Sequence, residues 1–197
     1  MPRDGRPARL RLQQAALDLY TERGFDQVTT AEIAARAGVT ERTFYRHFAD
    51  KREVLFGQED FLRDALERAV AEAPGTLGPL ATVLWAFRRI TPLLEDNRPL
   101  SEPLHQLTTA TPALRERELA KTASLACTMT AALGRRGVDD RCASLAAQTA
   151  LAVAGQATHL WIEQTARPLD HFLAQAIDDL NSLCETDDLP KDTHTSA

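Results

Sequence analysis

The segment TTAEIAARAGVTERTFYRHFADK, residues 29–51, is rich in side chains that hydrogen bond to nucleic acids. Arg42 and Arg46 each carry a planar fork of N–H donors, which matches the O6/N7 acceptor pair of guanine in a major groove. Hydroxyl, phenol, imidazole and ammonium groups nearby suit phosphate oxygens, which position a protein on DNA without specifying its sequence. The phosphate candidates are Thr29, Thr40, Tyr45, His47 and Lys51.

Two short helices are expected to position these side chains. Thr29 and Glu32 have the spacing of a capping box, which predicts a helix that runs to about Ala37. Gly38 supplies the left-handed residue that ends this helix, and Thr40 caps the next one. Two helices joined by a glycine turn are typical of a DNA-binding helix-turn-helix.

The second helix has distinct inner and outer faces. At about 100° per residue, Phe44 and Phe48 fall together and point inward. Arg42 and Arg46 point the opposite way with Thr43 beside them, and Tyr45 and His47 flank them. Two arginines can also serve only to keep an exposed helix soluble, but the capped pair and glycine turn favour base reading.

Glu41 has two interpretations. Its carboxylate can accept from a cytosine amino group, or it can favour the positive N-terminus of its helix, and the second is the better supported.

A preceding helical segment, LQQAALDLYTERGF, joins this pair, and residues 9–55 together resemble the DNA-binding region of the tetracycline-repressor (TetR) family. The shared residues are Ala15, Ala16, Gly24, Phe25, Thr29, Ile33, Ala34, Ala37, Gly38, Val39, Thr43, Tyr45, Phe48 and Lys51. The resemblance implies phosphate contacts at Thr29, Tyr45, His47 and Lys51, and base contacts at Glu41, Arg42, Thr43 and Arg46. The chain departs from the family at two positions: the family often has a small residue where Arg42 stands, and lysine or proline near Glu41.

The net charge of −5 is divided unevenly along the 197 residues. Residues 1–55 carry 10 Lys/Arg against 8 Asp/Glu, whereas the remainder carries 13 against 20. The leading segment holds Arg3, Arg6, Arg9 and Arg11 against only Asp4. This basic segment is interpreted either as an arm that lies on DNA or as a disordered, soluble tail.

The composition is typical of a soluble, cytoplasmic protein. No apolar run approaches the roughly 18 residues of a membrane span. Three cysteines, Cys127, Cys142 and Cys184, form an odd set without metal-like spacing, which predicts free thiols used for packing in a reducing compartment. His159 and Glu163 lie one turn apart but lack a third ligand, so we expect no metal. No nucleophile motif or phosphate-binding glycine loop appears, so we expect neither an enzyme nor a cofactor.

The periodicity predicts an all-α protein. We expect a helix-turn-helix domain over residues 1–52, a helical effector-binding and dimerisation domain over 53–185, and a flexible tail over 186–197. One long helix is predicted from about Asp50 to Ala73. The remaining predicted helices span about 78–95, 99–108, 112–135, 139–165 and 168–185.

The last two predicted helices are candidates for a homodimer interface. One is rich in alanine around Gly155, so a neighbouring helix can approach closely, and the other carries an apolar stripe. Pairing with a second copy makes a twofold four-helix interface, which the family resemblance favours; burial within the monomer is the alternative. The candidates are Ala152, Gly155, Phe172, Leu173, Ala176, Ile177 and Leu180.

Residues of the middle of the chain mix apolar bulk with polar groups, as ligand cavities do. These pocket candidates are Phe61, Trp85, Phe87, His105, Met129, Gln148 and Trp161. The sequence thus predicts a dimeric transcriptional regulator, a repressor released from a palindromic DNA operator by a small-molecule effector. The alternatives are an activator with the same fold and a DNA-binding or architectural protein without a ligand.

Overall fold

A computed structural model describes residues 6–57, 59–96, 98–164 and 166–185, and every regular element in these ranges is a helix. The predicted all-α class is confirmed. The elements are α1 (Arg6–Arg23), α2 (Thr30–Arg36), α3 (Glu41–His47), the 3-10 helix η1 (Glu53–Phe56), α4 (Glu59–Glu72), α5 (Pro79–Asp96), α6 (Arg98–Ala110), α7 (Pro112–Arg135), α8 (Asp140–Glu163) and α9 (Leu169–Glu185).

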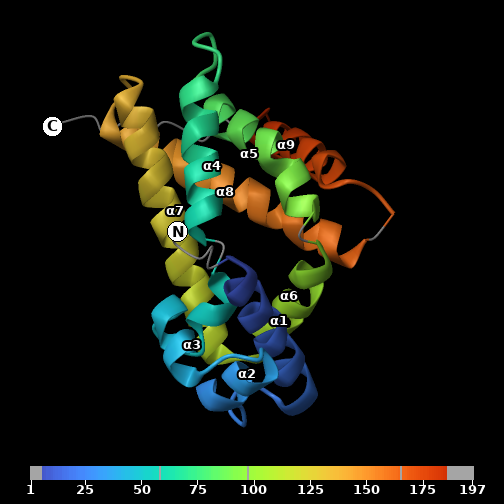
Figure 1. The fold of residues 1–197 in the computed structure, drawn as a ribbon. Coiled ribbons are helices and arrows are strands. Elements are labelled where there is room, and N and C mark those ends of the chain that lie inside the picture. The colour runs from blue at the N-terminus through green and yellow to red at the C-terminus, as the bar shows by residue number, and fades with distance from the viewer. Residues whose placement is uncertain (1–5, 58, 97, 165, 186–197) are drawn as a thin grey trace, which may run out of the picture.

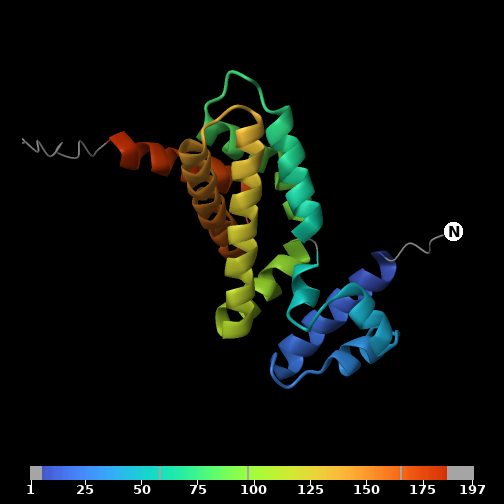
Figure 2. The same ribbon diagram turned by 90° about the vertical axis from the view of Figure 1, so that its left-hand side faces the viewer.

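The helices form a small headpiece, α1–α3, below a larger body, α4–α9 (Figures 1 and 2). Each part has its own cluster of buried apolar side chains. The headpiece cluster also takes in Val54 and Phe56 from η1 and the fully buried Leu114 from the start of α7. The headpiece core is therefore joined to the body at two places: through η1, which precedes α4, and through the start of α7, which follows α6.

The predicted helix from Asp50 to Ala73 is wrong, because the chain divides there into η1 and α4. The Asp50 carboxylate accepts the backbone N–H of Arg52 at 2.7 Å and of Glu53 at 3.1 Å, which starts a separate short turn. η1 then ends at Gly57, which packs too closely against the headpiece for a larger residue. The other predicted helices occur near their expected bounds.

The basic N-terminal segment is in part a helix. Arg6 begins α1, and within α1 the Arg11 Nε donates to the carbonyl of Ala37 at 3.2 Å. Arg9 likewise donates to the carbonyl of Gly57, so neither Arg9 nor Arg11 belongs to a free arm. Arg3 and the predicted tail, residues 186–197, lie outside the described residues.

The prediction that the cysteines pack in the core is wrong, because Cys127, Cys142 and Cys184 are all exposed. Their positions on outward helix faces give their thiols no core to fill. Within the described residues, no helix combines the length and apolar character needed to cross a bilayer.

Candidate nucleic-acid interface

The start of α2 is held by the predicted capping box. The Glu32 carboxylate accepts the Thr29 backbone N–H at 2.9 Å, and the Thr29 hydroxyl accepts the Glu32 N–H at 3.3 Å. Arg23 from α1 adds an ion pair to Glu32 at 2.7 Å. The Thr29 amide, and then Arg23, lower the pKa of Glu32 from its ordinary 4.5 to about 2. Gly38, with φ +67°, makes the left-handed turn that brings α3 across α2.

Helix α3 presents the faces that the sequence predicts. Phe44 is fully buried and Phe48 nearly so, and both belong to the headpiece core. Arg42 and Arg46 are exposed, and neither makes a hydrogen bond or ion pair with any described residue. Tyr45 is 55% exposed beside them. The outer face of α3 therefore offers two uncommitted guanidinium groups and a phenol to a partner.

A hydroxyl that the sequence analysis missed, that of Thr30, fixes one end of this face. It donates to Glu41 at 2.6 Å and lies 3.1 Å from the Tyr45 hydroxyl. Glu41 therefore ties α3 to α2, and Tyr45 is oriented by the same contact. The signal in the sequence was the second threonine of the capping segment, although the residues that it contacts lie 11 and 15 positions later in the chain.

The hydroxyls of Thr40 and Thr43 interact with each other at the start of α3. The Thr40 hydroxyl accepts the Thr43 backbone N–H at 3.2 Å, and the two hydroxyls lie 3.0 Å apart. Thr40 is exposed and Thr43 half-buried. Both stand at the N-terminus of α3, so they lie beside the arginines.

His47 is half-buried at the other end of α3. Its Nε2 is enclosed and has no hydrogen-bond partner among the described residues. Burial, followed by the positive charges of Arg46 and Arg9, lowers the pKa of His47 below its ordinary value. The imidazole is therefore neutral at physiological pH, so a phosphate contact here depends on an N–H donor and not on charge.

Lys51 has a different environment from the exposed phosphate ligand that the sequence predicts. Its ammonium donates to the carbonyls of Phe25 at 2.9 Å and Val28 at 3.1 Å, and reaches that of Asp26 at 3.5 Å. It also lies 4.3 Å from the centroid of the Phe25 ring. An ammonium has three donors, and here all three face the loop between α1 and α2. Lys51 thus closes that loop.

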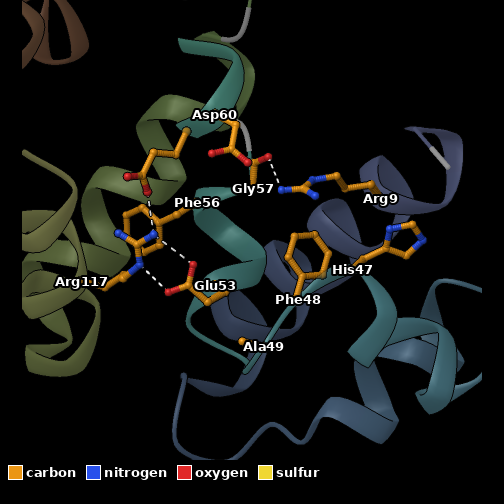
Figure 3. A pocket seen from close by; sticks show the side chains of 10 residues that line it. Arg9, His47, Phe48, Ala49, Glu53, Phe56, Gly57, Asp60 and Arg117 are labelled. Carbon is orange, nitrogen blue, oxygen red and sulfur yellow. Dashed lines mark hydrogen bonds and ion pairs between the residues drawn. The ribbon is translucent and has the colours of Figure 1, made fainter. Parts of the chain in front are cut away.

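The joint between headpiece and body is polar. Arg117 on α7 forms an ion pair with Glu53 of η1 (Figure 3). It forms a second ion pair, at 2.6 Å, with Glu59 of α4. These two carboxylates raise the pKa of Arg117. On the headpiece side, Arg9 donates to the Gly57 carbonyl and lies 4.9 Å from the Phe48 ring (Figure 3). These groups line a cleft of about 230 Å³ between the headpiece and the body.

Comparisons with known proteins agree with this headpiece geometry. Residues 12–57 match the family described as bacterial regulatory proteins, tetR family. The headpiece thus has the sequence of a TetR-family DNA-binding region. The chain is 33% identical over 91 residues to the HTH-type transcriptional regulator TcmR of Streptomyces glaucescens, a match that covers 46% of this chain and 40% of TcmR.

Two further comparisons extend beyond the headpiece. The nucleoid occlusion factor SlmA of Vibrio vulnificus is 32% identical over 130 residues, which cover 55% of this chain and 66% of SlmA. The chain thus spans less than two thirds of the length of these curated relatives. SmeT, the repressor of the Stenotrophomonas maltophilia multidrug efflux pump SmeDEF, was solved as a complex with triclosan. That complex has a TM-score of 0.62 at 22% identity and covers 89% of this chain and 90% of SmeT, a likeness of fold.

The residues predicted to line an effector pocket in the body are not gathered around one cavity. Phe87, Met129 and Trp161 are buried in the body core. Gln148 is exposed on the outside of α8, where its amide donates to Ser144 at 3.0 Å. Helical periodicity cannot predict which neighbouring helix covers a given helix face, because that depends on how the helices cross.

The other three pocket candidates lie elsewhere. Trp85 is half-buried, with the Arg89 guanidinium 5.7 Å from its ring. The His105 ring lies 5.2 Å from that of His159. Phe61 is beside a cavity of about 130 Å³ between the headpiece and the body.

Lys121, which the sequence analysis missed, also lines this cavity. It follows Leu114 and Arg117 on one face of α7, and the spacing of seven residues from a buried leucine was the signal.

The candidate dimer residues divide into two groups. Phe172, Leu173 and Ala176 are buried in the protein's own core, so they are intramolecular contacts. Ala152 and Gly155 are exposed on α8, and a Cβ built on Gly155 meets nothing within 4 Å. Ile177 and Leu180 are half-buried on α9. Exposed leucines at Leu145 and Leu183 continue these faces.

Proposed function

We propose that this protein is a homodimeric, DNA-binding transcriptional repressor that a small-molecule effector releases from its operator. The outer face of α3 carries the proposal, because Arg42 and Arg46 are exposed there without partners among the described residues. In this proposal the two arginines read bases and Tyr45, Thr29, Thr40 and His47 contact phosphates. The protein is a binding protein that acts in the cytoplasm, not an enzyme.

Two copies of the chain form a dimer whose twofold symmetry matches that of a palindromic operator. The proposed interface uses the exposed faces of α8 and α9, with Leu145, Ala152 and Gly155 on the first and Leu183 on the second. The small residues on α8 leave room for a helix of the partner to approach. The two headpieces then meet successive major grooves, about 34–36 Å apart.

The effector acts on the equilibrium between two spacings of the headpieces. A ligand that shifts the occupancy of these states from 1:99 to 99:1 must prefer one of them by about 5.5 kcal/mol. Support for a ligand comes from SmeT, whose structure holds triclosan. Support for transmission comes from the ion pairs of Arg117, which connect α7 of the body to α4 and to η1, whose Phe56 packs in the headpiece core.

Selection of bound duplexes from a random DNA pool, followed by light scattering of the free protein, tests the proposal. We expect a near-palindromic site and a dimer at micromolar concentration. A monomer that binds the selected site with full affinity would contradict the proposed interface. A pool without enriched sequence would contradict base reading by α3.

SlmA favours a second candidate, a dimeric DNA-binding protein that needs no effector, because the match to this nucleoid occlusion factor extends past the headpiece. A ligand panel separates the two. If no compound changes the melting temperature or weakens operator binding, the ligand-independent protein becomes the better account.

A further inference from the structure

The cavity between headpiece and body is mostly apolar and takes its walls from both parts. Leucines of α5 and α6, with Phe61 and Leu62 of α4, provide the body side. Phe56 of η1 and Gln13 of α1 provide the headpiece side. Gln13 is 7% exposed, and its Oε1 has no hydrogen-bond partner among the described residues. A ligand in this cavity therefore touches the DNA-binding part directly.

Lys121 brings a positive charge into these apolar surroundings. Its side chain is half-buried, and its ammonium makes no hydrogen bond or ion pair with any described residue. The Phe56 ring is 5.9 Å away. Glu59 also lines the cavity, but its carboxylate is 2.6 Å from Arg117 and is neutralised there. Burial lowers the pKa of Lys121, and the nearby negative charges of Glu118 and Glu59 oppose this only in part.

We propose that this cavity binds an apolar molecule bearing a carboxylate, with the carboxylate on the Lys121 ammonium and the apolar part among the leucines. Such a ligand places a negative charge directly at the ammonium and fills apolar space at once. The volume of about 130 Å³ limits its enclosed part. A dry cavity of ~150 Å³ accommodates benzene, so the enclosed part is about one aromatic ring or a chain of about six carbons.

The inference rests on the proposed function for its regulatory meaning, because the ligand is then the effector. Lys121 shares one face of α7 with Arg117 at the joint and Leu114 in the headpiece core. Phe56, which borders both the joint cleft and this cavity, lies against both cations. A carboxylate that draws Lys121 toward the cavity therefore pulls on the helix that holds the headpiece.

The test measures binding to the full-length protein without DNA, by calorimetry and thermal shift. The probes are benzoate, hexanoate, octanoate and decanoate, each compared with its neutral amide. We expect at least one carboxylate to bind tenfold or more tightly than its amide. Lys121→Met should abolish this preference and raise the melting temperature of the ligand-free protein, because an unpaired buried charge is removed. Arg68→Met, which removes an exposed cation on α4, should leave the preference unchanged.

If no carboxylate of the panel binds better than its amide, or if Lys121→Met keeps the preference, the inference is overturned. Operator binding is then measured separately in the presence of the tightest probe. Carboxylates that bind through Lys121 but leave DNA affinity unchanged contradict ligand-responsive repression and leave the site standing. Neutral compounds that release DNA equally from wild type and Lys121→Met contradict the site and leave the proposed function standing.

Discussion

Replacing Lys51 by methionine should destabilise the headpiece without removing a DNA contact. Methionine keeps much of the length and apolar character of the side chain and removes the ammonium. In the structure this ammonium holds the carbonyls of Phe25 and Val28 at ordinary hydrogen-bond distance. It reaches a third carbonyl, that of Asp26, at 3.5 Å, and also contacts the Phe25 ring. The loop between α1 and α2 therefore loses its main tie to the start of η1.

The magnitude follows from these contacts. A hydrogen bond to a charged group contributes about 1.5–3 kcal/mol net, and a cation over an aromatic ring at a partly exposed site about 0.5–1 kcal/mol. Water can reach this half-buried loop after the substitution, so we take the lower end and expect a total loss of about 2–3 kcal/mol. For a chain of this size each kcal/mol lowers the melting temperature by about 2–4 °C, so the fall should be roughly 5–10 °C.

Denaturant unfolding and binding isotherms at several salt concentrations distinguish this role from a phosphate contact. One phosphate contact contributes about 0.9 to the slope of log K against log salt, so a dimer that loses two should show a slope smaller by about two. We expect the slope to stay constant. Arg52→Met is the matched control, since Arg52 is exposed and pairs only with Asp50 among the described residues. Unchanged stability with a slope reduced by about two would refute the structural role of Lys51.

Four further substitutions test other positions in and beside the headpiece. Alanine at Arg42 or Arg46 should cost about 1–3 kcal/mol on the selected operator and little on scrambled DNA, and equal losses in both isotherms would reassign these arginines to phosphates. Gly57→Ala should lower the free energy of unfolding by about 1–3 kcal/mol, because the new Cβ would stand 2.8 Å from a ring carbon of buried Phe48; urea titration measures it, and an unchanged midpoint argues against close packing. Glu32 stabilises the fold above its ordinary pKa of 4.5 and loses that effect as the pH falls to about 2, so Glu32→Gln should flatten the pH dependence of unfolding in that window; an unaltered pH profile counts against the capping box.

Local interactions explain why much of the headpiece was predictable. The capping box of Thr29 and Glu32 and the left-handed turn at Gly38 join atoms only a few residues apart, so the residue types and their spacing suffice to predict them. The inward placement of Phe44 and the outward placement of Arg42 follow from helical periodicity alone. These features determined the helix-turn-helix and the candidate base-reading face from the sequence by itself.

Only the tertiary structure decided which neighbour covers each remaining face. Lys51 binds carbonyls 23 to 26 positions earlier in the chain, and Arg117 reaches carboxylates 58 and 64 positions earlier. Phe172 turned inward although its stripe suited a partner helix equally well. Periodicity states that a face is apolar or charged, but the contact it makes depends on helix crossings set by packing across the whole body. The place of Lys121 beside the cavity is of this kind, because Glu59, which lines the same cavity, forms its ion pair with Arg117 and not with Lys121.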